Sequence, residues 1–372
     1  MRILYLDPFH GGSHAAVANG YAQHSRHQID LLTLPIAGGW RWRMRGAAVT
    51  FARMLRERAT TPYDLIITTD MLDLATFLGL SRDITANTPT VVYFHENQLT
   101  YPLPAGRTRD LAFPWINYTS ALAATAVCFN SDFHRRVFLD ALPGLIGRYH
   151  DYQELAMIDA IAAKSHVLPP GVDLSGLTPS DPPSEPDGPP ILLWNSRWEY
   201  DKNPTAFFAA LEELEARGVD FRLIVLGEHV DPKEASFAAA RERFGGRALA
   251  WGYAPDVASY RARLRQADIV VSTAIQEFFG ISVIEAIACG CVPILPRRLS
   301  YPEIIPPAFH ADCLYEHDGA LADKLQEAIG NLPALKRRGL HTLASRYDWR
   351  QLAATYDAMF ETVIATANTK SK

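Results

Sequence analysis

Cysteine is scarce in this chain, and its few cysteines form no pattern that marks a metal centre or a disulfide framework. The 372 residues include four cysteines, each in an apolar segment: Cys128, Cys289, Cys291 and Cys313. Cys289 and Cys291 lack a second cysteine pair or a nearby histidine at the spacing of a zinc site. We therefore predict buried free thiols without a bound metal, and hence a protein of a reducing, cytoplasmic environment.

Long apolar runs are also absent, and lysine is absent from the first 150 residues. No apolar run reaches the roughly 20 residues that a helix needs to cross a bilayer, so we expect no stable membrane association. Residues 1–150 contain 14 arginines and 11 acidic residues, a net charge of +3, whereas the remainder carries −8. Any polyanionic partner is therefore expected to bind the N-terminal half.

The chain alternates short apolar strands with helical patterns, which predicts an α/β protein with doubly wound parallel sheets. In the first half the predicted strands are Ile3–Leu6, Ile29–Leu32, Leu65–Thr68, Thr90–Phe94, Ala126–Phe129 and His166–Leu168. In the second half they are Ile191–Trp194, Leu223–Leu226, Ala248–Trp251, Ile269–Ser272 and Val292–Leu295. Predicted helices include Ser13–Gln23, Gly46–Arg58, Asp132–Ala141 and one that Asn203 caps before Pro204.

A stretch rich in Pro, Asp and Ser divides the two series. We predict a Rossmann-like first domain over residues 1–170, a linker over 171–190 and a Rossmann-like second domain over 191–346. Residues 347–372 are predicted to form a terminal helix that runs to about Ala365.

Two carboxylates follow the predicted strand Ile269–Ser272. Glu277 lies in the next loop, and Glu285 lies in an otherwise apolar helix that begins after Gly280. A lone Glu would point to solvent or pair with an arginine, but here Gly280 permits close backbone approach. The first-turn amides of that helix are expected to form an anion site: Ile281, Ser282 and Val283. A phosphate above the helix, with carboxylates available for sugar hydroxyls, describes a nucleotide-sugar site.

The spacing Glu277-x7-Glu285, with Phe279-Gly280 between the two acids, resembles the signature of retaining glycosyltransferases of family 4. That family has the GT-B fold, in which two Rossmann-like domains face a cleft and a terminal helix crosses back to the first domain. The resemblance implies that Glu285 binds the ribose and Glu277 the sugar hydroxyls, with Phe279 and Gly280 also at the nucleotide sugar. We expect the base to lie near Trp251 and Tyr253.

A basic pair follows the strand Ile191–Trp194. Arg197 and Lys202 resemble the pair that family 4 uses in place of a metal to stabilise the diphosphate leaving group. The chain contains no Asp-x-Asp tract, the usual carboxylate pair of metal-dependent glycosyltransferases. We therefore expect transfer with retention and with neither a divalent metal nor another cofactor. The alternative is two solvated basic residues in a loop.

Two loops of the first domain fit the same family. Gly11 and Gly12, ahead of His14 and a helix, match its glycine loop and suit contact with phosphate or sugar. His95 follows the strand Thr90–Phe94 at the position where related enzymes keep a His or Asp that faces the donor sugar. A lone His would more often be structural, but its polar neighbours are costly to bury without a function. They are Glu96, Asn97 and Gln98.

The run from His95 through Tyr101-Pro102 resembles, more narrowly, the tRNA-queuosine α-mannosyltransferase group, as do Trp40-Arg41-Trp42-Arg43 and the segment around Asn117. This resemblance implies that a hexose, mannose from GDP-mannose, is moved onto the cyclopentenediol of queuosine in a tRNA anticodon. Arg41 and Arg43 would contact phosphates while Trp40 and Trp42 stack on bases. The alternative is that the tryptophans pack in the core and the arginines are ordinary surface charges.

Two further functions stay open from the sequence. A mannosyl- or glucosyltransferase acting on a lipid or glycan is suggested by Gly46–Arg58, where arginines lie beside Phe51, Met54 and Leu55 as in basic membrane-surface helices. A non-transferase protein that binds a sugar nucleotide, such as an epimerase or a sensor, fits the same four charged residues: Arg197, Lys202, Glu277 and Glu285. Product analysis separates transfer from binding.

Overall fold

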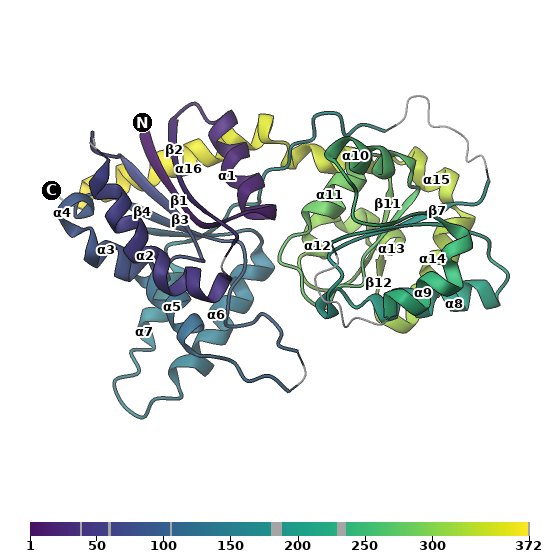
Figure 1. The fold of residues 1–372 in the computed structure, drawn as a ribbon, viewed down its shortest axis with the longest axis horizontal. Coiled ribbons are helices and arrows are strands. Elements are labelled where there is room, and N and C mark those ends of the chain that lie inside the picture. The colour runs from purple at the N-terminus through teal and green to yellow at the C-terminus, as the bar shows by residue number, and fades with distance from the viewer. Residues whose placement is uncertain (38, 59–60, 105, 180–187, 229–235, 371–372) are drawn as a thin grey trace. The chain divides into compact units, whose positions relative to one another are not determined.

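The computed structural model describes residues 1–37, 39–58, 61–104, 106–179, 188–228 and 236–370. The chain forms two compact units (Figure 1), the first from Met1–Val172 with Trp349–Lys372 and the second from Asp173–Asp348. Each unit is built on one six-stranded sheet, and the strands of both sheets pair in parallel. The predicted α/β fold with two doubly wound sheets is confirmed.

The first sheet has the strand order β2-β1-β3-β4-β5-β6. The chain continues from β1 to β2 on one side of the sheet, and from β3 to β4, β5 and β6 on the other. The carboxyl ends of β1 and β3 therefore mark the topological switch point, where α/β sheets bind ligands. Strands β3 and β4 are buried along their whole length, as expected for parallel strands covered on both faces. The bounds are β1 (Arg2–His10), β2 (Gln28–Pro35), β3 (Leu65–Thr69), β4 (Thr90–Phe94), β5 (Ala126–Phe129) and β6 (Ser165–Val167).

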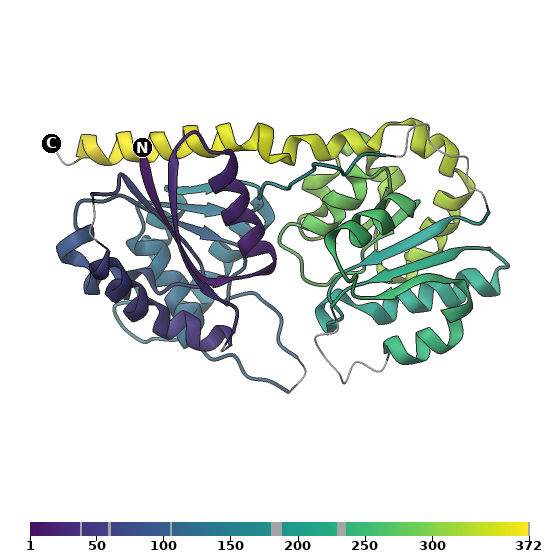
Figure 2. The same cartoon turned by 45° about the horizontal axis from the view of Figure 1, so that its top comes forward.

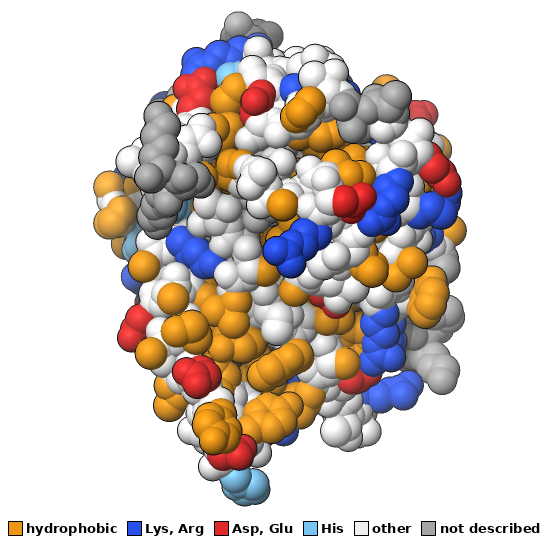
Figure 3. All heavy atoms as spheres, turned by 90° about the vertical axis from the view of Figure 1, so that its left-hand side faces the viewer, with side chains coloured by type: hydrophobic (Ala, Val, Ile, Leu, Met, Phe, Trp, Pro, Cys, Tyr) orange, Lys and Arg blue, Asp and Glu red, His pale blue; other side chains and the backbone are white. Residues whose placement is uncertain are grey.

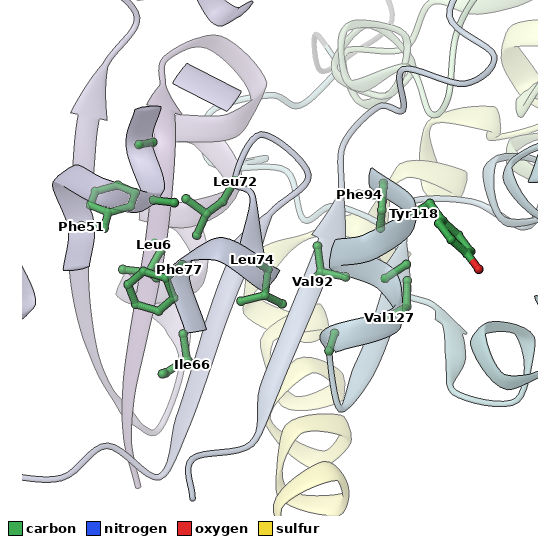
Figure 4. Close-up of a cluster of buried hydrophobic side chains, with 14 of the residues drawn as sticks. Leu6, Phe51, Ile66, Leu72, Leu74, Phe77, Val92, Phe94, Tyr118 and Val127 are labelled. Carbon is green, nitrogen blue, oxygen red and sulfur yellow. The ribbon is translucent and has the colours of Figure 1, made fainter. Parts of the chain in front are cut away.

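One face of this sheet is covered by a group of helices whose apolar side chains form a continuous core. Phe51, Phe77 and Tyr118 come from three of these helices and meet Leu6 and Val92 of the strands (Figure 4). Burial of this apolar surface is the main force that holds the helices to the sheet. The helices of the first unit before the crossing to the second are α1 (Gly12–His24), α2 (Trp40–Glu57), α3 (Leu74–Leu80), α4 (Arg82–Thr85), α5 (Ala112–Ala123), α6 (Asp132–Ile146) and α7 (Ala156–Ala162).

The other face of the sheet is covered by α1 and by the C-terminal helix α16 (Trp349–Lys370), which lie side by side (Figures 1 and 2). Trp349 is fully buried, and its indole occupies the space beside Gly20 and Gly171 that a Cβ on either glycine would need. A buried Asp357 accepts hydrogen bonds from Tyr21 and Ser25 near the end of α1. The last helix of the chain is therefore part of the core of the first unit.

The second sheet has the strand order β12-β11-β10-β7-β8-β9, so its switch point lies beyond β7 and β10. The strands are β7 (Ile191–Asn195), β8 (Arg222–Leu226), β9 (Ala248–Gly252), β10 (Ile269–Val271), β11 (Val292–Pro296) and β12 (Leu314–Tyr315). The helices are α8 (Pro204–Ala216), α9 (Ser236–Phe244), α10 (Val257–Gln266), α11 (Ile281–Ala288), α12 (Tyr301–Ile304), α13 (His310–Cys313), α14 (Leu321–Gly330) and α15 (Leu332–Arg337).

Some sequence predictions differ from the structure. Helix α2 begins at Trp40 and not at Gly46, and α16 runs to Lys370 and not to about Ala365. Asn203 precedes α8 as predicted, but it adopts a left-handed conformation and donates its side-chain amide to Asp318 at 2.9 Å, so it makes no capping hydrogen bond. Of the predicted linker 171–190, residues 180–187 lie outside the described residues.

All four cysteines are buried and free, as the sequence predicted. No helix among the described residues is both long and apolar enough to cross a membrane.

Candidate active site

The switch point of the first sheet gathers two carboxylates and two histidines. Asp7 lies in the buried part of β1, Asp70 follows β3 and His95 follows β4, while His14 enters from the first turn of α1. The rings of His14 and His95 are stacked with their centroids 4.0 Å apart. His14 Nδ1 lies 3.7 Å from Asp7 Oδ1. Residues that are far apart in the sequence thus meet because their strands are neighbours.

Asp70 fixes the loop that carries His95. It is fully buried, and its Oδ1 accepts the backbone N–H of His95 at 2.8 Å, while Asn130 donates to the His95 carbonyl at 2.8 Å. Asn117 bridges the same region, because its Nδ2 donates to the Asp70 carbonyl and its Oδ1 accepts from the Gln98 amide. Asn117, which the resemblance implied to bind substrate, is therefore a buried brace of this loop.

The residues of the predicted run His95–Gln98 make different contacts. Asn97 is buried, and its Oδ1 accepts hydrogen bonds from the amides of Leu99 and Thr100, so it shapes the turn. Glu96 is half-buried and accepts a hydrogen bond from Gln98 Nε2 at 2.9 Å. Several buried atoms in this region have no hydrogen-bond partner within the described part of the chain, among them His95 Nε2, Asp70 Oδ2, Asn97 Nδ2 and His14 Nδ1. Such atoms are costly to leave unpaired, which is a common mark of a functional site.

The charges of this cluster favour a proton on His14 and a neutral His95. Burial opposes the charged form of His14, but Asp7 and the nearby charges of Asp70 and Glu96 raise its pKa. Burial, together with the charge of His14, lowers the pKa of His95 well below its usual value. Burial raises the pKa of Asp70 to about 7, against the opposing effect of His14. The two shifts therefore favour a proton on His14 over one on His95.

The glycine loop and the Trp-Arg segment lie near this cluster. A Cβ on Gly11 would be 2.4 Å from Ile36, and Gly12 has a φ of +52°, so both positions require glycine. The segment Trp40–Arg43 is the first turn of α2, which sends its side chains to different sides. Trp40 packs on Phe113 with ring centroids 5.0 Å apart, which favours the core alternative for this residue.

The other members of the segment differ from Trp40. Arg43 donates to the carbonyls of Pro35 and Ala37, so it braces the loop before the helix. Arg41 and Trp42 are exposed. Farther along α2, Phe51 and Leu55 are buried in the core, so these side chains do not supply the membrane-facing surface that the lipid alternative required.

The switch point of the second sheet holds a buried lysine. Lys202 Nζ lies 2.8 Å from the Gln276 carbonyl, 3.1 Å from Asp201 and 3.3 Å from Glu277. Burial alone would lower the pKa of this lysine, but Glu277 and Asp201 raise it above its ordinary value. Arg197, by contrast, is exposed and pairs with Glu199 at 3.1 Å. The structure thus brings Lys202 and Glu277 together, as predicted, across the loops after β7 and β10.

Glu285 lies at the end of a short hydrogen-bonded chain. Tyr260 donates its hydroxyl to Glu285 Oε2 at 2.6 Å, and Asn195 donates to the same hydroxyl at 2.8 Å. Burial raises the pKa of Glu285, against the opposing effects of Tyr260 and Arg261. One carboxylate oxygen is thereby fixed by the protein, which orients the other.

The N-terminus of α11 is shaped by Gly280, which has a φ of +108° that only glycine adopts easily. The amide of Val283 donates to the Gly280 carbonyl at 3.1 Å, and Ser282 Oγ donates to the Asn195 carbonyl. The predicted anion site therefore depends mainly on the amides of Ile281 and Ser282. The ring of Phe279 is buried against Tyr347.

Of the two predicted base contacts, Trp251 lies in β9 and Tyr253 directly follows that strand. The ring of Trp251 is stacked near Phe208 and is partly buried, whereas Tyr253 is 77% exposed. Of these two aromatic residues, Tyr253 is the one whose ring a base could cover.

Sequence reasoning missed Asp7, Asp70, Asp201 and Tyr260. The first three carry a usable signal, because each is a polar residue at or just after the carboxyl end of a strand or in the loop that follows it. Tyr260 carries no such signal, since it lies inside α10 and reaches Glu285 only through the packing of α10 beside α11.

Comparisons with known proteins match both halves of the chain. Residues 2–172 match the family described as tRNA-queuosine alpha-mannosyltransferase N-terminal, and residues 180–339 match glycosyl transferases group 1. The tRNA-queuosine alpha-mannosyltransferase of Drosophila melanogaster is 34% identical over 332 residues, which cover 87% of this chain and 85% of that protein. A GDP-mannose-dependent alpha-(1-6)-phosphatidylinositol dimannoside mannosyltransferase of Mycobacterium tuberculosis is 23% identical over 333 residues, which cover 87% and 78%.

Among solved structures, the catalytic domain of starch synthase IV from Arabidopsis thaliana, bound to ADP and acarbose, superposes with a TM-score of 0.75. The superposition covers 98% of this chain and 99% of that one at 11% identity, so it bears on the fold alone. Two parallel sheets of this kind, with charged groups at both switch points, define a glycosyltransferase with the GT-B fold. More narrowly, the chain belongs to the tRNA-queuosine alpha-mannosyltransferase family. The predicted family resemblance is confirmed.

Proposed function

We propose that this enzyme transfers mannose from GDP-mannose to the cyclopentenediol of queuosine in a tRNA anticodon. The observation that carries the proposal is the 34% identity to the Drosophila melanogaster enzyme, which extends over 87% of this chain. The donor is supported by the GDP-mannose dependence named for the Mycobacterium tuberculosis relative. A cytoplasmic location suits both a tRNA substrate and four free thiols.

The second unit supplies the groups that a nucleotide sugar requires. Lys202 holds a positive charge for the diphosphate, and the amides of Ile281 and Ser282 add to it at the start of α11. Glu285, oriented by Tyr260, accepts hydrogen bonds from the ribose diol, while Glu277 contacts the sugar. Because a lysine and helix amides can stabilise the leaving group, we propose that no divalent metal takes part.

Transfer proceeds with retention of configuration in this proposal. The bond from the anomeric carbon to the GDP oxygen breaks, the bond to the acceptor oxygen forms on the same face, and the acceptor proton passes to the leaving diphosphate. Glu277 is held by Lys202 and by the Phe279 amide, which suits a binding role better than that of a nucleophile. The neutral His95 orients the mannose in the first unit.

The test is incubation with GDP-mannose and tRNA from cells with and without queuosine, followed by nucleoside mass spectrometry. A hexose increment on queuosine alone, unchanged by EDTA and α-linked by NMR, is the expected result. Efficient transfer to queuosine-free tRNA or to a lipid fraction would overturn the acceptor. A β-linked product would overturn retention, and activity that EDTA abolishes and magnesium restores would overturn the metal-free mechanism.

A further inference from the structure

We propose that the exposed face of α2 holds the nucleotides that flank the acceptor base, with arginines on the phosphates and Trp42 stacked on a base. This inference rests on the proposed function, because it assigns the tRNA contacts of the same reaction. The surface is defined by four residues of α2: Arg41, Trp42, Arg45 and Arg53.

Helical geometry selects these residues from a strongly basic segment. Residues 40–58 contain six arginines and a single acidic residue. Side chains three and four positions apart share one face of a helix, so Trp40 and Met44 point into the core while Arg41, Arg45 and Arg53 remain exposed. A row of arginines on one helix face matches the regular charges of an RNA backbone.

The indole ring of Trp42 is supported on one side by the helix and is open on the other. Its side chain is 68% exposed, yet one side of the indole rests on the helix, since a Cβ on Gly46 would be 2.9 Å from the ring. Glycine inside a helix costs stability relative to alanine, so its presence under the ring requires a reason. A tryptophan with one side supported and the other open suits stacking on an unpaired base.

The first turn of α2 is attached to the candidate active site. Trp40 packs with Phe9, Met44, Met71 and Phe113 in one small cluster. Phe9 is two residues beyond Asp7, and Met71 directly follows Asp70, so this cluster joins the helix to the strand ends that carry the buried carboxylates. The arginine row therefore begins beside the candidate active site and extends along a helix of about 27 Å.

Existing ion pairs leave these arginines available to phosphate. Arg45 pairs with Asp110 at 2.8 Å and Arg53 with Glu57 at 2.6 Å, but all four side chains are at least half exposed. Exposed pairs of this kind contribute little stability, so exchange for a phosphate costs little. Arg41 lies over the ring of Trp40, with its guanidinium carbon 4.6 Å from the ring centroid.

A second group of exposed aromatic residues supplies the control. Tyr149 and Tyr152, in the loop after α6, are 48% and 90% exposed, and Figure 3 shows hydrophobic side chains gathered at the lower end of this face of the first unit. Their exposed charged neighbours, however, are of mixed sign and include Asp151 and Glu154 beside Arg148. Arg148→Gln and Tyr152→Ala therefore remove an exposed arginine and an exposed aromatic ring outside α2.

The test measures tRNA affinity and the KM for queuosine tRNA in α2 variants and in these controls. Arg41→Gln/Arg45→Gln should raise the dissociation constant for tRNA and the KM at least tenfold. It should also reduce the slope of log affinity against log salt by about 1.4, or ~0.7 for each lost phosphate contact. Trp42→Ala should weaken binding about fivefold to a hundredfold, and Trp42→Phe should restore most of it. Gly46→Ala, which displaces the ring but favours the helix, should weaken binding without lowering the thermal midpoint.

GDP-mannose affinity and kcat should stay unchanged in all these variants, and the two controls should match the wild type. Equal tRNA affinity and salt slope in the arginine variant and in Arg148→Gln would overturn the surface. If the wild type transfers no mannose to any tRNA, the proposed function fails, while tRNA affinity still decides whether α2 is the RNA-binding face.

Discussion

The two switch-point sites of this enzyme differ in how their main ionisable side chains are paired. In the second unit, Lys202 and Glu277 are paired, and Glu285 is bonded to Tyr260. In the first unit, His95 Nε2 and Asp70 Oδ2 are buried without a hydrogen-bond partner among the described residues. Both sites occupy equivalent positions, at the carboxyl ends of parallel strands, so the difference comes from the residues and not from the fold.

This difference predicts that mutations at the two sites change stability and activity in different ways. Removing one member of a buried ion pair leaves a charge without compensation, so mutations at the second site should lower stability and activity together. Buried atoms that lack a partner already cost free energy in the folded state, so mutations at the first site should lower activity while stability is kept or increased. The predictions below test this contrast.

Lys202→Met is expected to have the largest effect. It removes the charge that we propose to bind the diphosphate, and it leaves the buried Asp201 and the half-buried Glu277 beside an apolar chain. We therefore expect kcat/KM to fall about a hundredfold to a thousandfold and stability to fall by about 3–5 kcal/mol. Urea unfolding and initial rates measure the two quantities. The double variant Lys202→Met/Glu277→Gln should recover part of the stability but none of the activity. An active double variant would remove Lys202 from the mechanism.

His95→Phe is the matched change in the first unit. Phenylalanine keeps the stacking with His14 and removes a buried nitrogen that has no partner, so the free energy of unfolding should stay equal or rise. The rate of transfer should fall by about a hundredfold, since the ring can no longer make the hydrogen bond to the donor sugar that we propose. A variant that loses stability as Lys202→Met does would contradict the contrast between the two sites.

Glu285→Ala and Tyr260→Phe test how the second site is organised. Loss of a charge-assisted contact costs about 1.5–3 kcal/mol, so Glu285→Ala should weaken GDP binding about tenfold to a hundredfold. Tyr260→Phe removes only the hydroxyl that orients Glu285, so a loss of about threefold to tenfold is expected. Calorimetric titration with GDP measures both. Unchanged affinity in Glu285→Ala would exclude it from the site, and a larger loss in Tyr260→Phe would make the tyrosine the ligand.

The sequence predicts much of the fold because strand patterns and the loops after them are local properties. The alternation of elements, the Glu277-x7-Glu285 spacing and the position of His95 are all read from neighbouring residues. The start of α2 was missed because the first turn alternates Trp and Arg, which does not follow the period of a helix. The structure shows which of these side chains faces the core, because Trp40 packs on Phe113.

Other features depend on which strands pair and which helices pack together, and the sequence alone does not show this. Asp7 and Asp70 become neighbours because β1 pairs with β3, and Tyr260 meets Glu285 because α10 packs beside α11. The hydrogen-bond chain through Asn195 likewise joins three separate segments. Knowledge of the strand order would have identified both aspartates, since Asp7 lies in the last part of β1 and Asp70 directly follows β3, at the switch point.

The last prediction is a pH dependence of stability that arises from Asp70 in the first site. Burial raises the pKa of Asp70 to about 7, so the folded state holds a proton that the unfolded chain releases near pH 4. The stability that protonated Asp70 contributes is therefore complete below pH 4 and is lost as the pH rises through about 7. His14, Glu96 and the amide of His95 are the groups that act on this carboxyl.

Asp70→Asn keeps an acceptor for the His95 amide and removes the titration. Relative to this variant, the wild type should lose stability between pH 4 and pH 8, by about 1.4 kcal/mol for each unit of pKa shift. Urea unfolding of the wild type and of Asp70→Asn across this range measures the difference. Parallel pH profiles for the wild type and Asp70→Asn would show that Asp70 titrates normally, and the buried oxygen would then have to be paired in solution.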